Sequence, residues 1–86
     1  MTSTSTALKS ASRIHIAREA TRRIDELLQP ALDELQSAIN IGNGGGVYHD
    51  VPRVRSAMAR LKRAIDCAQA VEASVTWPTA EDYDHA

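Results

Sequence analysis

The chain has 86 residues, no phenylalanine, a single cysteine and a formal net charge of −1. A chain of this length forms at most one domain and buries only about 60% of the surface that its unfolded form exposes. The charge balance excludes a general attraction to nucleic acid or acidic membranes, and one cysteine excludes an internal disulfide framework. No apolar run approaches the roughly 18 residues of a membrane span, so we expect a soluble, cytoplasmic protein.

A long amphipathic helix is predicted for the first half of the chain. Residues 1–6 form a polar Ser/Thr run, which predicts a disordered N-terminus. From about residue 7 to residue 41, apolar residues recur at steps of three and four. This stripe consists of Ile14, Ala17, Ile24, Leu28, Ala31, Leu35, Ala38 and Ile39. A shoulder widens the stripe beyond what one partner helix covers, which indicates a helical bundle; it consists of Ile16, Ala20 and Leu27.

Pro30 interrupts this pattern. An interior proline removes one backbone hydrogen bond and clashes with the preceding turn, at a cost of about 3 kcal/mol. Because the apolar stripe continues in phase on both sides, we expect one helix that is kinked near residues 26–29. The alternative is a helix that restarts at Pro30, with Asp33 and Glu34 near the new N-terminus, where the helix dipole favours acids.

A second helix follows a glycine-rich turn at Gly42–Gly46. Asp50 is its expected N-cap and Pro52 lies in its first turn. The periodic pattern predicts a helix over about residues 51–75, which a Trp-Pro pair ends. Residues 77–86 form an acidic tail, and the sequence leaves open whether this tail docks.

The two apolar stripes are matched in register. In successive pairs the two residue numbers add up to nearly the same value, as expected for antiparallel helices joined by one turn. The pairs are Ile39 with Val54, Leu35 with Met58, Leu32 with Leu61, Leu28 with Ile65, and Ile24 with Ala68. We therefore predict an all-α antiparallel helical hairpin over residues 7–76.

The first helix is longer than the second, so part of its apolar stripe extends beyond the hairpin. An exposed apolar surface of this kind usually has a partner, and a second copy would complete a four-helix bundle. We expect five residues to make the contacts: Leu8, Ile14, Ile16, Leu27 and Trp77.

Charged and polar residues supply the remaining candidates. Arg53, Arg60 and Arg63 are expected to form a charged rim or, in the alternative interpretation, to contact phosphates. Glu72 lies opposite Thr21 in the predicted register. A polar layer that fixes register explains this pair better than an acid or base without a second catalytic group.

No catalytic, metal or cofactor motif is present in the sequence. The histidines are scattered, and the glycine run lacks the spacing of a phosphate-binding loop. We therefore expect a non-enzymatic protein–protein interaction module of adaptor or inhibitor type, a class common among bacterial and phage accessory proteins. Its expected partners are a second copy and an unidentified protein. The alternative is a nucleic-acid-associated helical protein that uses the basic second helix, although no aromatic residue is interleaved there for base stacking.

Overall fold

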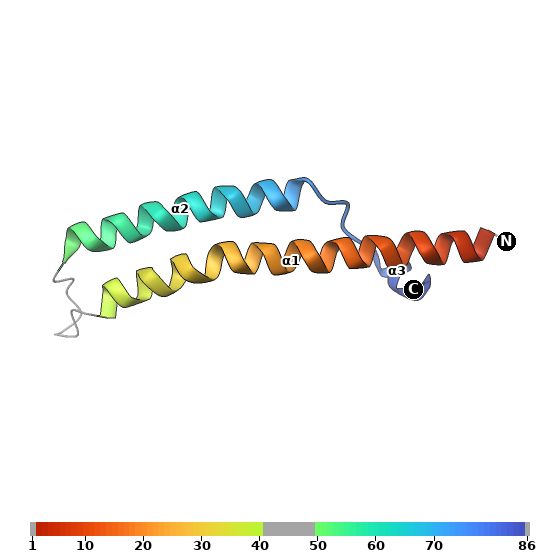
Figure 1. Cartoon of the computed structure of the whole chain (residues 1–86), viewed down its shortest axis with the longest axis horizontal. Coiled ribbons are helices and arrows are strands. Elements are labelled where there is room, and N and C mark those ends of the chain that lie inside the picture. Colours follow the sequence, from red (N-terminus) through yellow and green to blue (C-terminus); the bar gives the residue numbers. More distant parts are fainter. Residues whose placement is uncertain (1, 41–49, 86) are drawn as a thin grey trace.

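The structure, a computed structural model, describes residues 2–40 and 50–85. These residues form three helices: α1 (Thr2–Asn40), α2 (Val51–Ala73) and α3 (Ala80–His85). The described ranges contain no strand, and α1 packs against α2 (Figure 1). The predicted all-α chain with a long first helix packed on the second is confirmed.

The molecule is a rod with principal extents of 65 × 21 × 14 Å. Figure 1 shows α1 and α2 running antiparallel and side by side, with the N-terminal part of α1 extending beyond the end of α2. The segment 74–79 then crosses α1 in this view, and α3 lies beside the N-terminal part of α1. The acidic tail, whose docking the sequence left open, therefore covers part of the predicted overhang.

The helix α1 begins at Thr2, whereas the sequence predicted disorder over residues 1–6 and a helix from about residue 7. A polar Ser/Thr run carries no periodic signal, yet a helix that is already nucleated can extend by one hydrogen bond per residue. At the other end, α1 is described to Asn40. The predicted residue 41 and the glycine-rich turn lie outside the described residues.

Pro30 lies inside α1, so the structure has one continuous helix and not a restart. Its side chain is exposed, which keeps the ring away from the contact with α2. Figure 1 shows the last third of α1, the part that contains Pro30, inclined relative to the nearly straight N-terminal part. This change of direction is consistent with the expected kink.

The helix α2 begins as predicted. Asp50 is the N-cap, and its Oδ1 accepts a hydrogen bond from the Arg53 backbone N–H at 3.0 Å, with Pro52 in the first turn. The helix ends at Ala73, two residues before the predicted end. The last turn is closed by Ser74, whose backbone N–H and hydroxyl both donate to the Val71 carbonyl oxygen.

The contact between α1 and α2 is a seam of small residues. In the described chain the buried apolar residues of this seam are Ala20, Ala31, Ala38, Val54, Ala57 and Ala68, so five of the six are alanines; Ile14 and Ala17 are also buried, but beside α3 and the segment before it. Ala38, Val54 and the fully buried Ala57 form a buried cluster near the C-terminal end of α1. Small side chains let two helix backbones approach closely, so the larger residues of both stripes lie beside the seam and stay partly exposed.

The register agrees with the predicted pairing. Ala38 packs near Val54, and Glu34 forms an ion pair with Arg60 across the two helices. Both contacts fall within one residue of the predicted pairs. The burial of the paired residues differs from the expectation, because several of the large apolar residues in these pairs are exposed and do not form the core.

Candidate interaction surfaces

One exposed apolar surface extends along the hairpin, and we call it the hairpin face. It consists of Leu32 and Ile39 on α1 and Val51, Met58 and Ile65 on α2. Each of these side chains is between 39% and 49% exposed. Within each helix they are seven residues apart, or nearly two full turns, so each set lines up along one side of its helix.

Both sets lie on the same side of the hairpin. The Glu34–Arg60 ion pair marks the opposite side, since its partners meet across the two helices. Glu34 is two residues from Leu32 and Arg60 is two residues from Met58, a step of about 200° around a helix. The hairpin face is therefore one continuous surface that both helices share. Half-buried leucines lie between it and the seam: Leu28, Leu35 and Leu61.

A groove follows the α1 margin of the hairpin face. Its volume is about 510 Å³, and it is lined by Gln29, Leu32, Asp33, Leu35, Gln36 and Ile39. The amide of Gln29 donates to Asp33 Oδ1 at 3.0 Å, which holds the carboxylate beside the groove. This arrangement combines an apolar floor with a rim that can accept hydrogen bonds from a cation.

The α2 margin of the same face is basic. Arg55 and Lys62 are exposed and seven residues apart, so they lie along one side of α2 next to Val51, Met58 and Ile65. Neither of the two cations has an ion pair within the described ranges. The hairpin face thus has one margin with an acid and amides and one margin with free cations.

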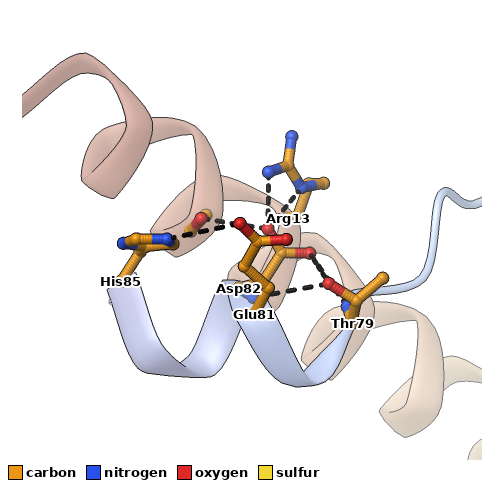
Figure 2. A network of polar contacts seen from close by, with 6 residues as sticks. Arg13, Thr79, Glu81, Asp82 and His85 are labelled. Atoms are coloured by element: carbon orange, nitrogen blue, oxygen red, sulfur yellow. Dashed lines mark hydrogen bonds and ion pairs between the residues drawn. The ribbon is translucent and has the colours of Figure 1, made fainter. Parts of the chain in front are cut away.

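The second surface is the N-terminal part of α1, which α3 covers. Figure 2 shows Asp82 of α3 directed at α1, and this side chain is only 6% exposed. Its Oδ1 accepts hydrogen bonds from Ser10 Oγ at 2.9 Å and from Arg13 Nε and Nη2 at 3.1 and 2.5 Å. Its Oδ2 accepts from the Thr79 backbone N–H at 2.9 Å. We call these four residues the tail clamp: Ser10, Arg13, Thr79 and Asp82.

The tail clamp is also the N-terminal cap of α3. The Asp82 backbone N–H donates to the Thr79 carbonyl at 3.0 Å and lies 3.4 Å from the Thr79 hydroxyl. Together with the bond from Thr79 N–H to the carboxylate, this is the reciprocal pattern of a capping box, with Asp in place of Glu. The sequence signal was the Thr-x-x-Asp spacing directly after Pro78, which our sequence analysis did not use.

Charge and hydrogen bonding stabilise the ionised Asp82. Hydrogen bonds hold the pKa of the Asp82 carboxyl well below its usual range, against the opposing effect of burial. The bond from Arg13 contributes most, followed by those from the Thr79 backbone N–H and from Ser10. The same contact raises the pKa of Arg13. His85 and Glu81 approach each other at 3.6 Å on α3 (Figure 2), and both line a groove that Ser10 and Arg13 of α1 also line.

The five predicted contact residues do not form one patch. Leu8 and Ile16 are exposed, at 68% and 51%, whereas Ile14 is buried in the region that α3 covers. Leu27 is half-buried in a groove with Cys67 and Val71. The Trp77 indole N–H donates to the Glu72 carbonyl oxygen at 3.0 Å, which ties this ring to the end of α2.

The three predicted rim arginines lie apart from the hairpin face margin. Arg60 is paired with Glu34 on the opposite side, and the exposed Arg53 lies in the first turn of α2 beside its N-cap. Arg63 is exposed. The cations beside the hairpin face are instead Arg55 and Lys62, because residue spacing along the helix, and not clustering in the sequence, decides which side a charge occupies.

The predicted polar layer is not buried in the single chain. Thr21 and Glu72 are both exposed, and the Thr21 hydroxyl donates to the Ala17 carbonyl of its own helix at 2.8 Å. The two positions lie at the end of the seam, where α2 approaches its last turn, so a side chain there can turn to water. This is the physical reason that the expected core position is exposed.

In the described ranges, no three His, Cys, Asp or Glu residues lie close enough together to hold a metal ion. None of the helices in those ranges has an apolar stretch long enough to cross a membrane. Comparison with family models, curated proteins and solved structures gave no match to this chain.

Proposed function

We propose that this protein is a non-enzymatic protein–protein interaction module that acts through its hairpin face. The observation that carries the proposal is the continuous apolar surface of Leu32, Ile39, Val51, Met58 and Ile65, exposed along both helices. The first partner is a second copy of the chain, and the product is a four-helix bundle. Adaptor and inhibitor proteins of this size act in the same way, by presenting a helical surface to a partner.

The size of the surface supports this proposal. From Val51 to Ile65 the helix rises about 21 Å, and two helices packed about 10 Å apart present a width of about 20 Å. The apolar area is therefore about 400 Å², which is the size of the largest apolar patch on a typical monomer, a patch that is often functional, and about half of the about 800 Å² per partner in a standard interface. Burial of such area stabilises an assembly by about 25 cal/mol per Å².

The small core gives a second argument. An alanine seam buries little area per residue, and layered folds need two apolar surfaces packed against each other. Small domains often gain their missing stability by oligomerisation. The seven-residue spacing of the exposed side chains is also the spacing at which helices of a bundle interdigitate.

The alternative partner, nucleic acid, receives less support. One of the three arginines proposed for phosphate contact, Arg60, is already paired with Glu34. A phosphate would have to compete with this carboxylate. We place the module in the cytoplasm because a free, exposed cysteine, Cys67, suits a reducing compartment.

The test is the solution mass of the chain and of two matched variants, measured by light scattering over a dilution series. The unmodified chain should have twice the mass of 9.3 kDa. Met58→Glu places a charged side chain in the apolar hairpin face and should weaken association strongly, because desolvating a carboxylate is costly even beside the exposed Arg55 and Lys62. Its helicity should persist, since glutamate is a good helix former.

Ala70→Glu is the control, because Ala70 is exposed beside the groove of Leu27 and Cys67, away from the hairpin face. This variant should keep the mass of the unmodified chain. A monomeric unmodified chain, or a Met58→Glu variant that associates as tightly as Ala70→Glu, would overturn the proposal.

A further inference from the structure

We infer that two copies associate through their hairpin faces in one orientation. In this orientation α1 of each copy lies over α2 of the other, and the end of each hairpin where α1 finishes and α2 begins lies beside the same end of the other copy. This inference rests on the proposed function, since it requires that the hairpin face meets a second copy. It adds which helix meets which and names the residues that decide the orientation.

Twofold symmetry allows two ways to bring the same face of two hairpins together. With the axis parallel to the helices, α1 lies over α2 of the second copy and equivalent ends coincide. With the axis across the helices, α1 lies over α1 and α2 over α2, and equivalent ends are far apart. Both arrangements bury the apolar residues, so the charged margins distinguish them.

The basic margin of α2 disfavours the second arrangement. Arg55 and Lys62 lie along this margin without acidic partners in the described chain. If α2 lay over α2, Lys62 of each copy would approach Arg55 of the other, so four cations would meet at the centre of one contact line, with Asp66, one turn beyond each Lys62, as the acid on that margin. Like charges at such an interface are repulsive and select against the arrangement.

The α1 margin accepts those cations in the first arrangement. Asp33, held by the Gln29 amide, and the Gln36 side chain line the groove beside the apolar floor. An axis parallel to the helices places Lys62 and Arg55 of the second copy along this groove. Each interface then contains the complementary margins twice, once on each side of the bundle.

The observed register sets the heights of these groups. The ion pair of Glu34 with Arg60 shows which residues of α1 and α2 are level. On this register Asp33 and Lys62 differ in height by about one residue, a rise of about 1.5 Å. An axis parallel to the helices preserves height, so Asp33 of one copy meets Lys62 of the other.

The apolar side chains interdigitate at the same register. Leu32 is level with a point between Met58 and Ile65, and Ile39 is level with a point between Val51 and Met58. In the first arrangement each α1 side chain therefore enters a space between two α2 side chains of the second copy. This is the packing expected between neighbouring helices of a bundle.

The test is a distance between spin labels on the intact dimer. Ser12 on α1 is exposed, and it lies 22 residues, or about 33 Å, from the level of Glu34. The chain with Cys67→Ser and Ser12→Cys carries one label per copy. Equivalent ends together give a separation below about 40 Å, set by the width of a four-helix bundle. Equivalent ends apart give about 65 Å, twice the distance from the centre.

The solution mass of the labelled sample is measured on the same preparation. A dimer with the short distance supports the inference, and a dimer with the long distance overturns the orientation while leaving the proposed function intact. A monomeric mass overturns the proposed function and the inference with it.

A charge exchange provides the matched control. Asp33→Lys and Lys62→Asp should each weaken the dimer several-fold, and the double variant should recover most of the loss, because it restores the pair in reversed order. Reversal at exposed Arg53, Arg53→Glu, should leave association unchanged, because Arg53 is seven residues from Arg60 and so lies on the side of α2 away from the hairpin face. If the double variant is as weak as the two losses combined, Asp33 and Lys62 do not meet and the inferred orientation is wrong.

Discussion

The N-terminal and C-terminal parts of α1 are covered in different ways. In the N-terminal part, α3 docks through a buried carboxylate that accepts hydrogen bonds from Ser10 and Arg13. In the C-terminal part, α2 packs through an alanine seam, and the large apolar residues remain exposed beside it. One helix therefore has a polar, closed contact at one end and an apolar, open contact at the other.

The difference follows from the directionality of the two contacts. The guanidinium of Arg13 presents its donors in a fixed plane and the Ser10 hydroxyl adds a third donor, so they select one acceptor, Asp82, and a charge left without it would be unfavourable. Apolar contact has no such directional requirement, and its strength grows with area. The closed end can thus be satisfied by six residues of α3, whereas the open end requires a second large apolar surface.

The largest expected effect on stability comes from widening the alanine seam. Ala57 is fully buried against Ala38 and Val54, so Ala57→Leu should separate the helices and lower the free energy of unfolding by about 1–3 kcal/mol. Urea denaturation followed by circular dichroism measures this loss. Ala59→Leu adds the same volume at an exposed position of α2 and should change stability little. Equal losses in the two variants would show that Ala57 is not at a close helix contact.

At the closed end, Asp82→Asn should release α3. The amide keeps the size of the carboxylate but loses its charge and one of its two acceptor oxygens. A six-residue helix has no stability of its own in water, so the amide protons of α3 should exchange at nearly the unfolded rate while those of α2 stay protected. Hydrogen exchange followed by NMR measures both. Asp84→Asn, on the same helix at an exposed position, should retain protection. Unchanged protection in Asp82→Asn would mean that apolar contacts hold α3.

Acid should release α3 by the same route. The pKa of Asp82 is lowered in the folded chain, so its contribution is complete above the ordinary value of about 3.9 and is lost as the pH falls below it toward the lowered value. Docking should therefore be constant from pH 7 to about 5 and weaken below about pH 4. Trp77 fluorescence can follow this change, because the ring lies next to the tail clamp. The Asp82→Asn variant should lack the transition.

The two ends also differ in how well the sequence predicts them. The hairpin, its register and the Asp50 cap follow from periodicity and local signals. The tail clamp depends on the path by which residues 74–79 return to α1, and no periodic pattern encodes the meeting of Asp82 with Arg13. Only the local part of the tail clamp, the Thr79-x-x-Asp82 cap, has a signal in the sequence from which it can be predicted.

The exposure of the large apolar residues was not predictable from the stripe alone. A wide stripe shows how much of a helix is apolar, but not which part of that width one partner covers. Here the alanines lie at the contact line, and Leu32 and Met58 lie beside it. The small size of alanine allows the close approach, and a pattern that counts all apolar residues equally does not register this difference.

A smaller effect should come from the cap at the open end. Asp50→Ala removes the acceptor for the Arg53 backbone N–H and should lower stability by about 1 kcal/mol. Urea denaturation gives the value, and Asp66→Ala, an exposed substitution inside α2, is the control. Protection of α3 should be unaffected, because the cap lies at the far end of α2. Loss of α3 protection in Asp50→Ala would mean that the two ends are coupled.

The smallest effect should come from the ion pair between Glu34 and Arg60. Both side chains are partly exposed, and pairs of this kind contribute about 0.2–1 kcal/mol. Arg60→Gln should lose this amount at low salt and nothing at about 1 M salt, where charges are screened over about 3 Å. Arg63→Gln, at an exposed position with no ion pair among the described residues, should be neutral at both salt concentrations. A loss in Arg60→Gln that salt does not remove would assign the effect to packing of the arginine stem. The seam would then depend on that stem to keep α2 from rotating, and the hairpin face would be set by a charged residue on its opposite side.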